Sequence, residues 1–229
     1  MRKTITAIVP VRKGSQRVKN KNFKPFADSN LLEIKINTLK QIKTIDKIIV
    51  STDSIIAIET AKRLGVECHE RDDYFASSEC SNSEFFKNLG ECCEGDFLMY
   101  TPVTAPLIKP QTYYDFINRF SNVIDNHDSM LTSSYVKDHM WLDGKPVNYD
   151  PQNAPNTQDL PDIMKLTYGI SIISKENMIK YKNVVGKKPT FYLLEGEETI
   201  DVNFTSSTND LVPDTPLDFK FAEFLYTNR

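Results

Sequence analysis

Short runs of β-branched and other apolar residues alternate with longer amphipathic patterns from the start of the chain to about residue 135. Apolar runs that predict strands occupy residues 4–11, 47–50, 66–69 and 96–100. Patterns with one apolar helical face occupy residues 31–41, 54–64, 83–90 and 110–120. Strands that alternate with helices form βαβ units. We therefore expect a three-layer α/β fold, in which helices cover both faces of a mostly parallel twisted sheet.

The second half of the chain departs from this alternation. Residues 138–165 are polar, rich in Asn and Pro, and without periodicity. A loop of this length without its own pattern usually serves function or forms an interface. Strand character returns at residues 168–173, 190–194 and 199–204, and a closing helix is expected at residues 216–226. We expect one domain, residues 1–229, from which residues 138–165 protrude as an arm.

Composition excludes several classes of function. No apolar run approaches the roughly 20 residues that cross a bilayer, and the apolar part of the opening segment is too short for a secretory signal, so we expect a cytoplasmic protein without membrane contact. The net charge of -3 gives no bulk attraction to nucleic acid. The four cysteines lack CxxC spacing, which predicts reduced thiols rather than a zinc site; they are Cys68, Cys80, Cys92 and Cys93.

The loop after the first strand is strongly basic. The stretch VPVRKGSQRVKNKN carries five cations within ten residues, namely Arg12, Lys13, Arg17, Lys19 and Lys21. In parallel sheets, ligands bind beyond the carboxyl ends of the strands. Guanidinium and ammonium groups beside a flexible Gly-Ser pair suit a triphosphate, although a solvated surface turn is the simpler alternative. Neither a Walker A loop nor a GxGxxG fingerprint is present.

The same stretch resembles the signature [IL]PARxGSKxxxxKN of the CMP-N-acylneuraminate cytidylyltransferases, the CMP-sialic acid synthetases. Further segments are similar in the same order: DKIIVSTDS to the second strand and STD turn, RDDYFASSECSNSE to RPxxLAxDxxxxxE, and TPVTAPL to QPTSPL. NTQDLP is similar to RQxLP, YGISI to NGAIY, and TIDVN with DTPLDFKFAE to the closing IDIDTxxDFxxAE. The resemblance covers essentially the whole chain, and its first and last motifs are the most specific.

This resemblance implies a fold of the nucleotide-diphospho-sugar transferase type and a CTP-dependent reaction. An acid sugar, either sialic or another nonulosonic acid, would be activated to a CMP-sugar with release of pyrophosphate. The resemblance also implies Mg²⁺, with Mn²⁺ as a substitute, and a homodimer formed through the arm. The implied catalytic residues are Arg12 and Lys21; the nucleotide-binding set is Arg12, Gly14, Ser15, Lys21, Asn22, Arg71, Ser81 and Ser83; the substrate-binding set is Thr104, Ala105 and Gln158; the metal ligands are Asp201, Asn203 and Asp214.

Several positions depart from the family pattern, mainly on the acceptor side. Asn203 replaces an aspartate, and Pro102 and Ile108 replace the Gln and Arg of QPTSPLR. Tyr168 replaces the Asn of NGAIY. We expect that nucleotide use is retained and that these changes affect which acceptor is used, so that another nonulosonic acid is weighed beside N-acetylneuraminate. The alternatives are 3-deoxy-manno-octulosonate, a polyol or sugar phosphate, or a catalytically impaired nucleotide-binding homologue.

Two further aspartates have a structural interpretation. Asp53 follows a Ser-Thr pair directly before a helix, so we expect it to cap that helix rather than to contact a ligand. Asp214 precedes the closing helix, and a role as the N-cap of that helix explains it as well as a role as a metal ligand does.

Overall fold

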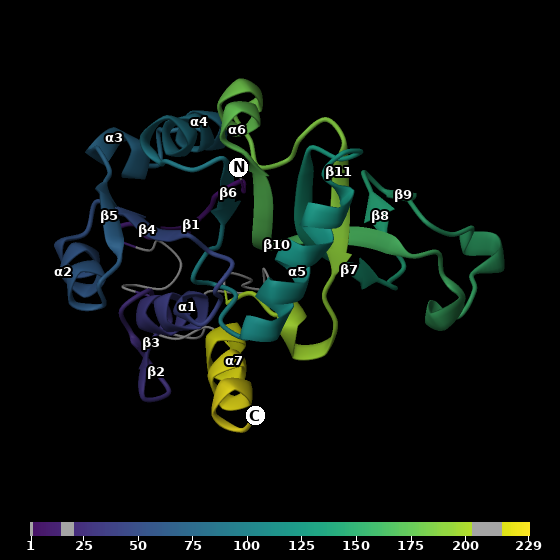
Figure 1. Cartoon of the computed structure of the whole chain (residues 1–229). Helices are drawn as coiled ribbons and strands as arrows, with labels where there is room; N and C mark the ends of the chain where they lie inside the picture. The colour runs from purple at the N-terminus through teal and green to yellow at the C-terminus, as the bar shows by residue number, and fades with distance from the viewer. Residues whose placement is uncertain (1, 15–20, 203–216) are drawn as a thin grey trace.

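A seven-stranded sheet forms the centre of the computed structural model, which describes residues 2–14, 21–202 and 217–229 (Figure 1). The strand order is β11-β7-β10-β6-β1-β4-β5. Their bounds are β1 Ile5–Pro10, β4 Lys47–Thr52, β5 Glu67–Glu70, β6 Phe97–Tyr100, β7 Ser129–Val136, β10 Ile163–Ser174 and β11 Pro189–Leu193. All neighbours are parallel except that β10 runs antiparallel to both β6 and β7. The expected α/β class with a mostly parallel sheet is confirmed.

Helices cover both faces of the sheet, as the two separate clusters of buried apolar residues show. One face carries α1 (Leu31–Lys40), α2 (Ile55–Arg63), α5 (Pro110–Val123) and α7 (Leu217–Thr227). The other face carries α4 (Asn82–Cys92) and α6 (Lys175–Tyr181), and the single turn α3 (Asp73–Ala76) precedes α4. Within the described part of the chain, no helix has both the length and the apolar character that crossing a membrane requires.

Helix α1 starts where local sequence favours a start. A small hairpin of β2 (Pro25–Phe26) and β3 (Ser29–Asn30) leads into it from the basic loop. The side chain of Asn30 accepts a hydrogen bond from the amide of Glu33, which satisfies one of the free donors of the first turn. This cap fixes the entry of α1 beside β1.

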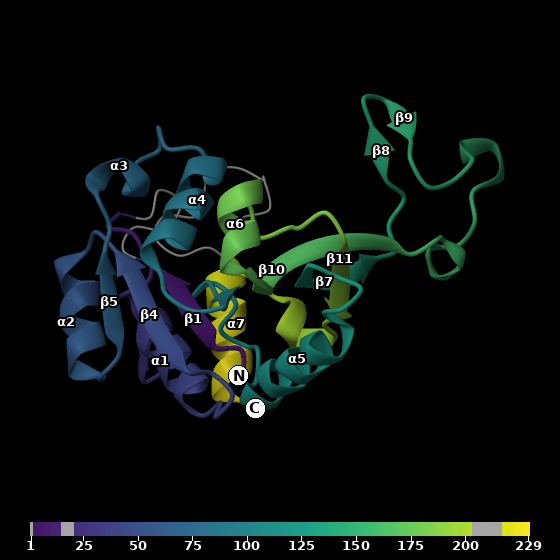
Figure 2. The ribbon, with the colours of Figure 1, turned by 45° about the horizontal axis from the view of Figure 1, so that its top comes forward.

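The arm protrudes from the sheet between β7 and β10 and comprises residues 137–162 (Figure 2). It contains a hairpin of β8 (Trp141–Leu142) and β9 (Lys145–Pro146), and the 3₁₀ turns η1 (Pro151–Asn153) and η2 (Thr157–Asp159). Its predicted end at residue 165 is wrong, because β10 already begins at Ile163 and pairs there with Val136. Trp141 is 53% exposed and Leu142 is 67% exposed, so the arm carries apolar surface.

Two other expectations differ from the structure. The strand predicted at residues 199–204 is wrong: η3 (Gly196–Thr199) ends there, residues 200–202 are outside any strand, and residues 203–204 lie outside the described residues. Val202 is nevertheless buried, which explains its apolar character. Strand β7 lacks a separate prediction, because its sequence SMLTSSYV has no long apolar run.

Candidate active site

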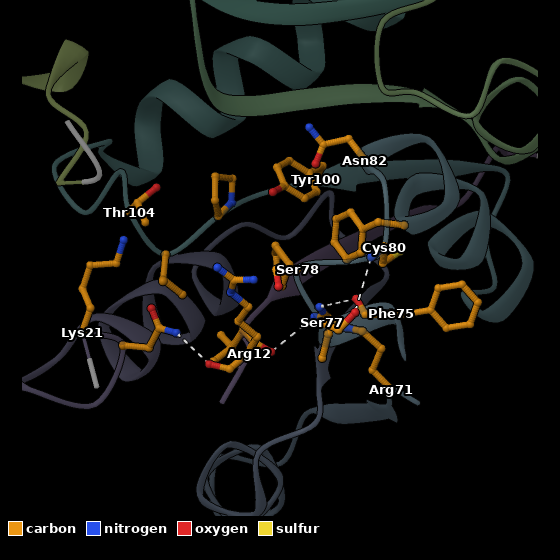
Figure 3. A pocket seen from close by; sticks show the side chains of 17 residues that line it. Arg12, Lys21, Arg71, Phe75, Ser77, Ser78, Cys80, Asn82, Tyr100 and Thr104 are labelled. Atoms are coloured by element: carbon orange, nitrogen blue, oxygen red, sulfur yellow. Dashed lines mark hydrogen bonds between the residues drawn. The ribbon is translucent and has the colours of Figure 1, made fainter. Parts of the chain in front are cut away.

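A cavity of about 490 Å³ opens beyond the carboxyl ends of β1 and β6 (Figure 3). This volume is in the usual range for small-molecule sites. Its lining comes from the end of β1, the basic loop, the segment around α3 and the loop after β6. The lining residues are Pro10, Val11, Arg12, Lys21, Asn22, Arg71, Phe75, Ala76, Ser77, Ser78, Cys80, Asn82, Phe85, Tyr100, Pro102, Val103 and Thr104.

Arg12, Lys21 and Asn22 form what we call the basic side of the cavity. Lys21 is only 5% exposed, yet it lines the hollow together with Arg12, and Figure 3 shows both cationic side chains directed into it. The Asn22 side-chain amide donates to the carbonyl of Arg12 over 3.5 Å, which joins the two ends of the loop. Cations gathered in a hollow of reduced dielectric attract a polyanion strongly. Gly14 has a φ of +76°, and the predicted Ser15 lies outside the described residues.

Asp53 serves the basic loop rather than helix α2. Its carboxylate accepts a hydrogen bond of 2.7 Å from the backbone amide of Lys13. The N-cap of α2 is Ser54, without a side-chain capping bond, so the expectation that Asp53 caps this helix is wrong. The reason is the strand order: β4 lies beside β1, and this brings the residue after β4 next to the loop after β1.

Arg71 lines the cavity and also braces its wall. Its guanidinium donates to the carbonyls of Val11 at 3.2 Å and Phe75 at 3.4 Å. It also donates to both the hydroxyl and the carbonyl of Ser51, and it lies 4.9 Å from the ring centroid of Phe85. Burial lowers the pKa of Arg71 from its ordinary value, although an arginine remains charged at neutral pH. Arg71 therefore ties the ends of β1 and β4 to α3.

Ser81 and Ser83 do not line the cavity. Ser81 begins α4 and forms a capping box with Glu84: its hydroxyl donates to the Glu84 carboxylate at 2.6 Å and accepts from the Glu84 amide. Ser83 is exposed in the first turn of the same helix. Polar lining in this region comes instead from residues that the sequence did not single out, Ser77, Ser78 and Asn82.

Thr104 stands on what we call the Thr104 side, which comprises Thr104, Ala105, Asp201 and Val202. The Thr104 hydroxyl donates to the Asp201 carboxylate at 3.0 Å, and the Thr104 carbonyl accepts from the amide of Val202 at 2.9 Å. These two bonds fasten residues 201–202 to the loop after β6. Ala105 lies behind Thr104, 3% exposed, and is not part of the lining.

One predicted metal ligand, Asp201, is placed next to the cavity by its bond to the lining residue Thr104. Asn203 and Asp214 lie outside the described residues. Among the residues that are described, no group of three or more His, Cys, Asp or Glu side chains could enclose a metal ion. Mg²⁺ is usually held by one or two carboxylates together with substrate phosphates rather than by a protein cage. A single carboxylate beside a basic hollow therefore fits such an ion.

Gln158 is remote from the lining of this cavity. It lies in η2 of the arm, where it is exposed, and the arm extends away from the sheet (Figure 2). Its predicted contact with an acceptor stays a prediction.

Lys35 is a residue that the sequence reasoning missed. It lies in α1, is 2% exposed, and donates to the Ala105 carbonyl at 2.9 Å and to the Tyr113 hydroxyl at 2.5 Å. Burial lowers the pKa of Lys35 to about 7, and the negative charge of Asp201 opposes this effect. A signal was available, because Lys35 stands four residues after Leu31 on the apolar face of the helix.

Comparison with known proteins identifies relatives along the whole chain. The cytidylyltransferase family model matches residues 6–228. Post-translational flagellin modification protein B of Campylobacter coli is 25% identical over 240 residues, with 96% of this chain and 94% of that protein covered. N-acylneuraminate cytidylyltransferase of Escherichia coli is 24% identical, with 89% of this chain and 50% of that protein covered, so the chain spans about half of its length.

Solved structures share the fold. CMP:2-keto-3-deoxy-manno-octonic acid synthetase complexed with CTP superposes with a TM-score of 0.66 at 11% identity, covering 98% of this chain and 99% of that one. 4-Diphosphocytidyl-2C-methyl-D-erythritol synthase from Anaerococcus prevotii gives 0.65 at 15% identity, covering 99% and 97%. These likenesses confirm the expected nucleotide-diphospho-sugar transferase type of fold. Since the family model spans nearly all residues and agrees with the resemblance of the sequence motifs, the chain belongs to the cytidylyltransferase family of nucleotidyltransferase enzymes.

Proposed function

We propose that this cytidylyltransferase activates an acid sugar, a sialic or other nonulosonic acid, to a CMP-sugar with CTP as the donor. The observation that carries the proposal is the cavity in which Arg12 and Lys21 stand at the end of the central strand β1, together with Thr104 and its partner Asp201. The name of the N-acylneuraminate cytidylyltransferase to which the chain is similar supports this substrate class.

In this proposal the basic side binds the triphosphate. Arg12 and Lys21 would form charge-assisted bonds to its oxygens, and their charge would stabilise the negative charge that develops as pyrophosphate departs. An oxygen of the acceptor attacks the α-phosphorus, the bond from that phosphorus to the bridging oxygen breaks, and pyrophosphate leaves. Because phosphoryl-type transfer depends mainly on positioning and charge neutralisation, these residues need not form a covalent intermediate.

The cytidine would occupy the part of the cavity near α3. Ser77, Ser78 and Asn82 offer hydroxyl and amide groups there, which suit the amino and carbonyl groups of a pyrimidine. Burial raises the pKa of Tyr100 to about 12, so its hydroxyl stays protonated and remains available as a hydrogen-bond donor. Arg71 would keep this wall in place through its bonds to backbone carbonyls.

Asp201 would hold a Mg²⁺ or Mn²⁺ ion together with the phosphates of CTP, with Asn203 or Asp214 as further candidate ligands. Such an ion supplies charge neutralisation at the α-phosphate and pyrophosphate oxygens. The hydrogen bond from Thr104 directs the Asp201 carboxylate and thereby orients it for this role.

The acceptor would lie near Pro102, Val103 and Thr104. This segment carries no cation, although an acid sugar presents a carboxylate. We propose that the arm of a second copy, in a homodimer, brings Gln158 and neighbouring polar groups to complete this part of the site. The departures from the family pattern at Pro102 and Ile108 are the observation that favours a different acceptor, 3-deoxy-manno-octulosonate or a polyol phosphate, because these acceptors are also anionic and the missing cation does not separate them from a nonulosonic acid.

A screen of acceptors tests the proposal. The purified chain is incubated with CTP, Mg²⁺ and, separately, N-acetylneuraminate, other nonulosonic acids, 3-deoxy-manno-octulosonate and 2-C-methylerythritol 4-phosphate, while pyrophosphate release is measured. We expect release with a nonulosonic acid, and release slower by about 10²-fold or more when Arg12→Ala replaces the wild type. Release only with one of the last two compounds would overturn the acceptor class. CTP binding by calorimetry without turnover, with either Mg²⁺ or Mn²⁺, would identify a nucleotide-binding homologue.

A further inference from the structure

Lys35 is buried at a position where a cation is costly. Its side chain is 2% exposed, and its two hydrogen-bond partners are neutral, a backbone carbonyl and a phenol. Removing an ammonium group from water costs free energy that an apolar side chain of similar length would not cost. Burial accordingly lowers the pKa of Lys35 from its ordinary value. Packing alone therefore gives no reason for a lysine here.

The contacts of Lys35 lead directly to the Thr104 side of the cavity. Its ammonium holds the carbonyl of Ala105, the residue next to Thr104. Thr104 in turn bonds to Asp201 through its hydroxyl and to Val202 through its carbonyl. Three segments that are far apart in the sequence, at residues 35, 104–105 and 201–202, thus form one connected unit.

The anchor of this unit is rigid. Lys35 lies in the middle of α1, and Tyr113, its second partner, is a fully buried residue of α5. Both helices pack against the same face of the sheet. The hydrogen bond from Lys35 therefore fixes the carbonyl of Ala105 relative to the sheet. The carbonyl is not free to turn toward the cavity.

We propose that Lys35 is a positioning residue for cytidylyl transfer, which orients Thr104 and Asp201 through the carbonyl of Ala105 without touching a substrate. The proposal rests on the proposed function in so far as the Thr104 side receives the acceptor. It assigns to α1 a role in the reaction that is separate from the triphosphate contacts of the basic side.

Substitution Lys35→Met tests this role, since methionine fills a similar volume without charge or donor. We expect kcat to fall about tenfold or more and the KM for the turned-over acceptor to rise at least threefold, while the Kd of CTP measured by calorimetry changes less than twofold. Lys40→Met is the matched control. Lys40 also donates to a backbone carbonyl from α1, but it is exposed and bonds to Leu64, away from the cavity. We expect wild-type kinetics from this control.

A second measurement does not require an acceptor. The amide of Val202 donates to Thr104, so its hydrogen exchange reports the connection between the two segments. In Lys35→Met we expect about tenfold faster exchange in the peptide that contains Val202 and unchanged exchange in β1. If no acid sugar is turned over, the proposed function fails, while the exchange at Val202 still decides whether Lys35 holds this segment.

Two results would overturn the proposed role of Lys35. Wild-type kinetics and wild-type exchange at Val202 in Lys35→Met would overturn the proposal. A parallel loss of CTP affinity, turnover and thermal stability would also overturn it, because a general packing defect would then explain the effect. Should Lys35→Met fail to fold, Tyr113→Phe removes one partner and keeps the amino group of Lys35. We expect this variant to raise the acceptor KM about threefold with CTP affinity intact, and no change would count against the proposal.

Discussion

The two sides of the cavity are built in different ways. The basic side comes from one stretch of chain, in which Arg12, Lys21 and Asn22 follow the central strand within a single loop. The Thr104 side joins two distant segments through hydrogen bonds, with Thr104 and Asp201 separated by 97 positions, and Lys35 of α1 holds one of them. A contiguous group of charges is visible in a sequence, whereas a site assembled by sheet order is not.

The two sides also differ in the sign of the charges that they carry. Arg12 and Lys21 concentrate positive charge in a hollow, an arrangement that a polyanionic ligand would neutralise. On the Thr104 side, the Asp201 carboxylate already accepts a hydrogen bond from Thr104 and interacts with the charge of Lys35. We therefore expect substitutions on the basic side to act mainly through CTP, and substitutions on the Thr104 side to act mainly through metal and acceptor.

The largest effect is expected on the basic side. Arg12→Ala and Lys21→Ala should each lower kcat/KM by about 10²-fold or more, a few kcal/mol, because charge-assisted contacts to a triphosphate are lost. Steady-state pyrophosphate release measures this effect. Lys13→Ala is the matched control: Lys13 is exposed, belongs to the same loop and does not line the cavity. Equal losses in all three variants would show that only the general charge of the loop matters.

The next effect separates the two sides. Asp201→Ala should lower metal-dependent turnover about tenfold to a hundredfold and raise the Mg²⁺ concentration for half-maximal rate, since a hard anionic ligand is removed. CTP affinity measured without metal should change little. Full activity in this variant would move the metal site to Asp214. A loss of CTP affinity in the absence of metal would instead show that Asp201 acts on CTP binding, as the residues of the basic side are expected to do.

The sequence predicted the first half of the fold well. The strands β1, β4 and β6 and the helices α1 and α5 lie within three residues of their expected bounds, because buried strands and amphipathic helices have distinct periods. The apolar residues near position 202 predict a strand, but Val202 packs into the apolar core from outside the sheet and donates its amide to Thr104. The position of β10 between β6 and β7 depends on long-range pairing, which no local pattern encodes.

The candidate site was predictable to the same extent. Five of the predicted residues line the cavity, Arg12, Lys21, Asn22, Arg71 and Thr104, and the first three belong to one conspicuous motif. The partner of Asp53 could not be found from sequence, because the Lys13 amide reaches it only through the pairing of β1 with β4. Lys35 can be recognised in the sequence as a charged residue on an apolar helix face, but its partners Ala105 and Tyr113 cannot.

A smaller effect concerns the support of the basic loop. Asp53→Ala removes the acceptor of the Lys13 amide, so the loop loses one fixed point beside Arg12. We expect the Kd of CTP to rise about threefold to tenfold, in line with the loss of one hydrogen bond to a charged group at a partly exposed site. Calorimetry measures it, with Asp73→Ala in α3 as an exposed aspartate control. If Asp53 supported only α2, Asp53→Ala would lower the stability of that helix and leave the Kd of CTP unchanged.

The smallest effect distinguishes a cap from a nucleotide ligand. Ser81→Ala should lower the free energy of unfolding by about 1 kcal/mol, the usual contribution of an N-cap serine, and should leave CTP affinity within twofold, because Ser81 does not line the cavity.

Hydrogen bonds from Ser81, followed by one from Tyr74, lower the pKa of Glu84 from its ordinary value. A carboxylate with a depressed pKa stabilises the folded state above its unfolded pKa, and this contribution disappears as the pH falls through the folded pKa. Denaturant unfolding at neutral and at acidic pH should therefore show a smaller difference between wild type and Ser81→Ala in acid. A tenfold loss of CTP affinity would instead place Ser81 at the nucleotide, and the wall beside α4 would then have to rearrange when CTP binds.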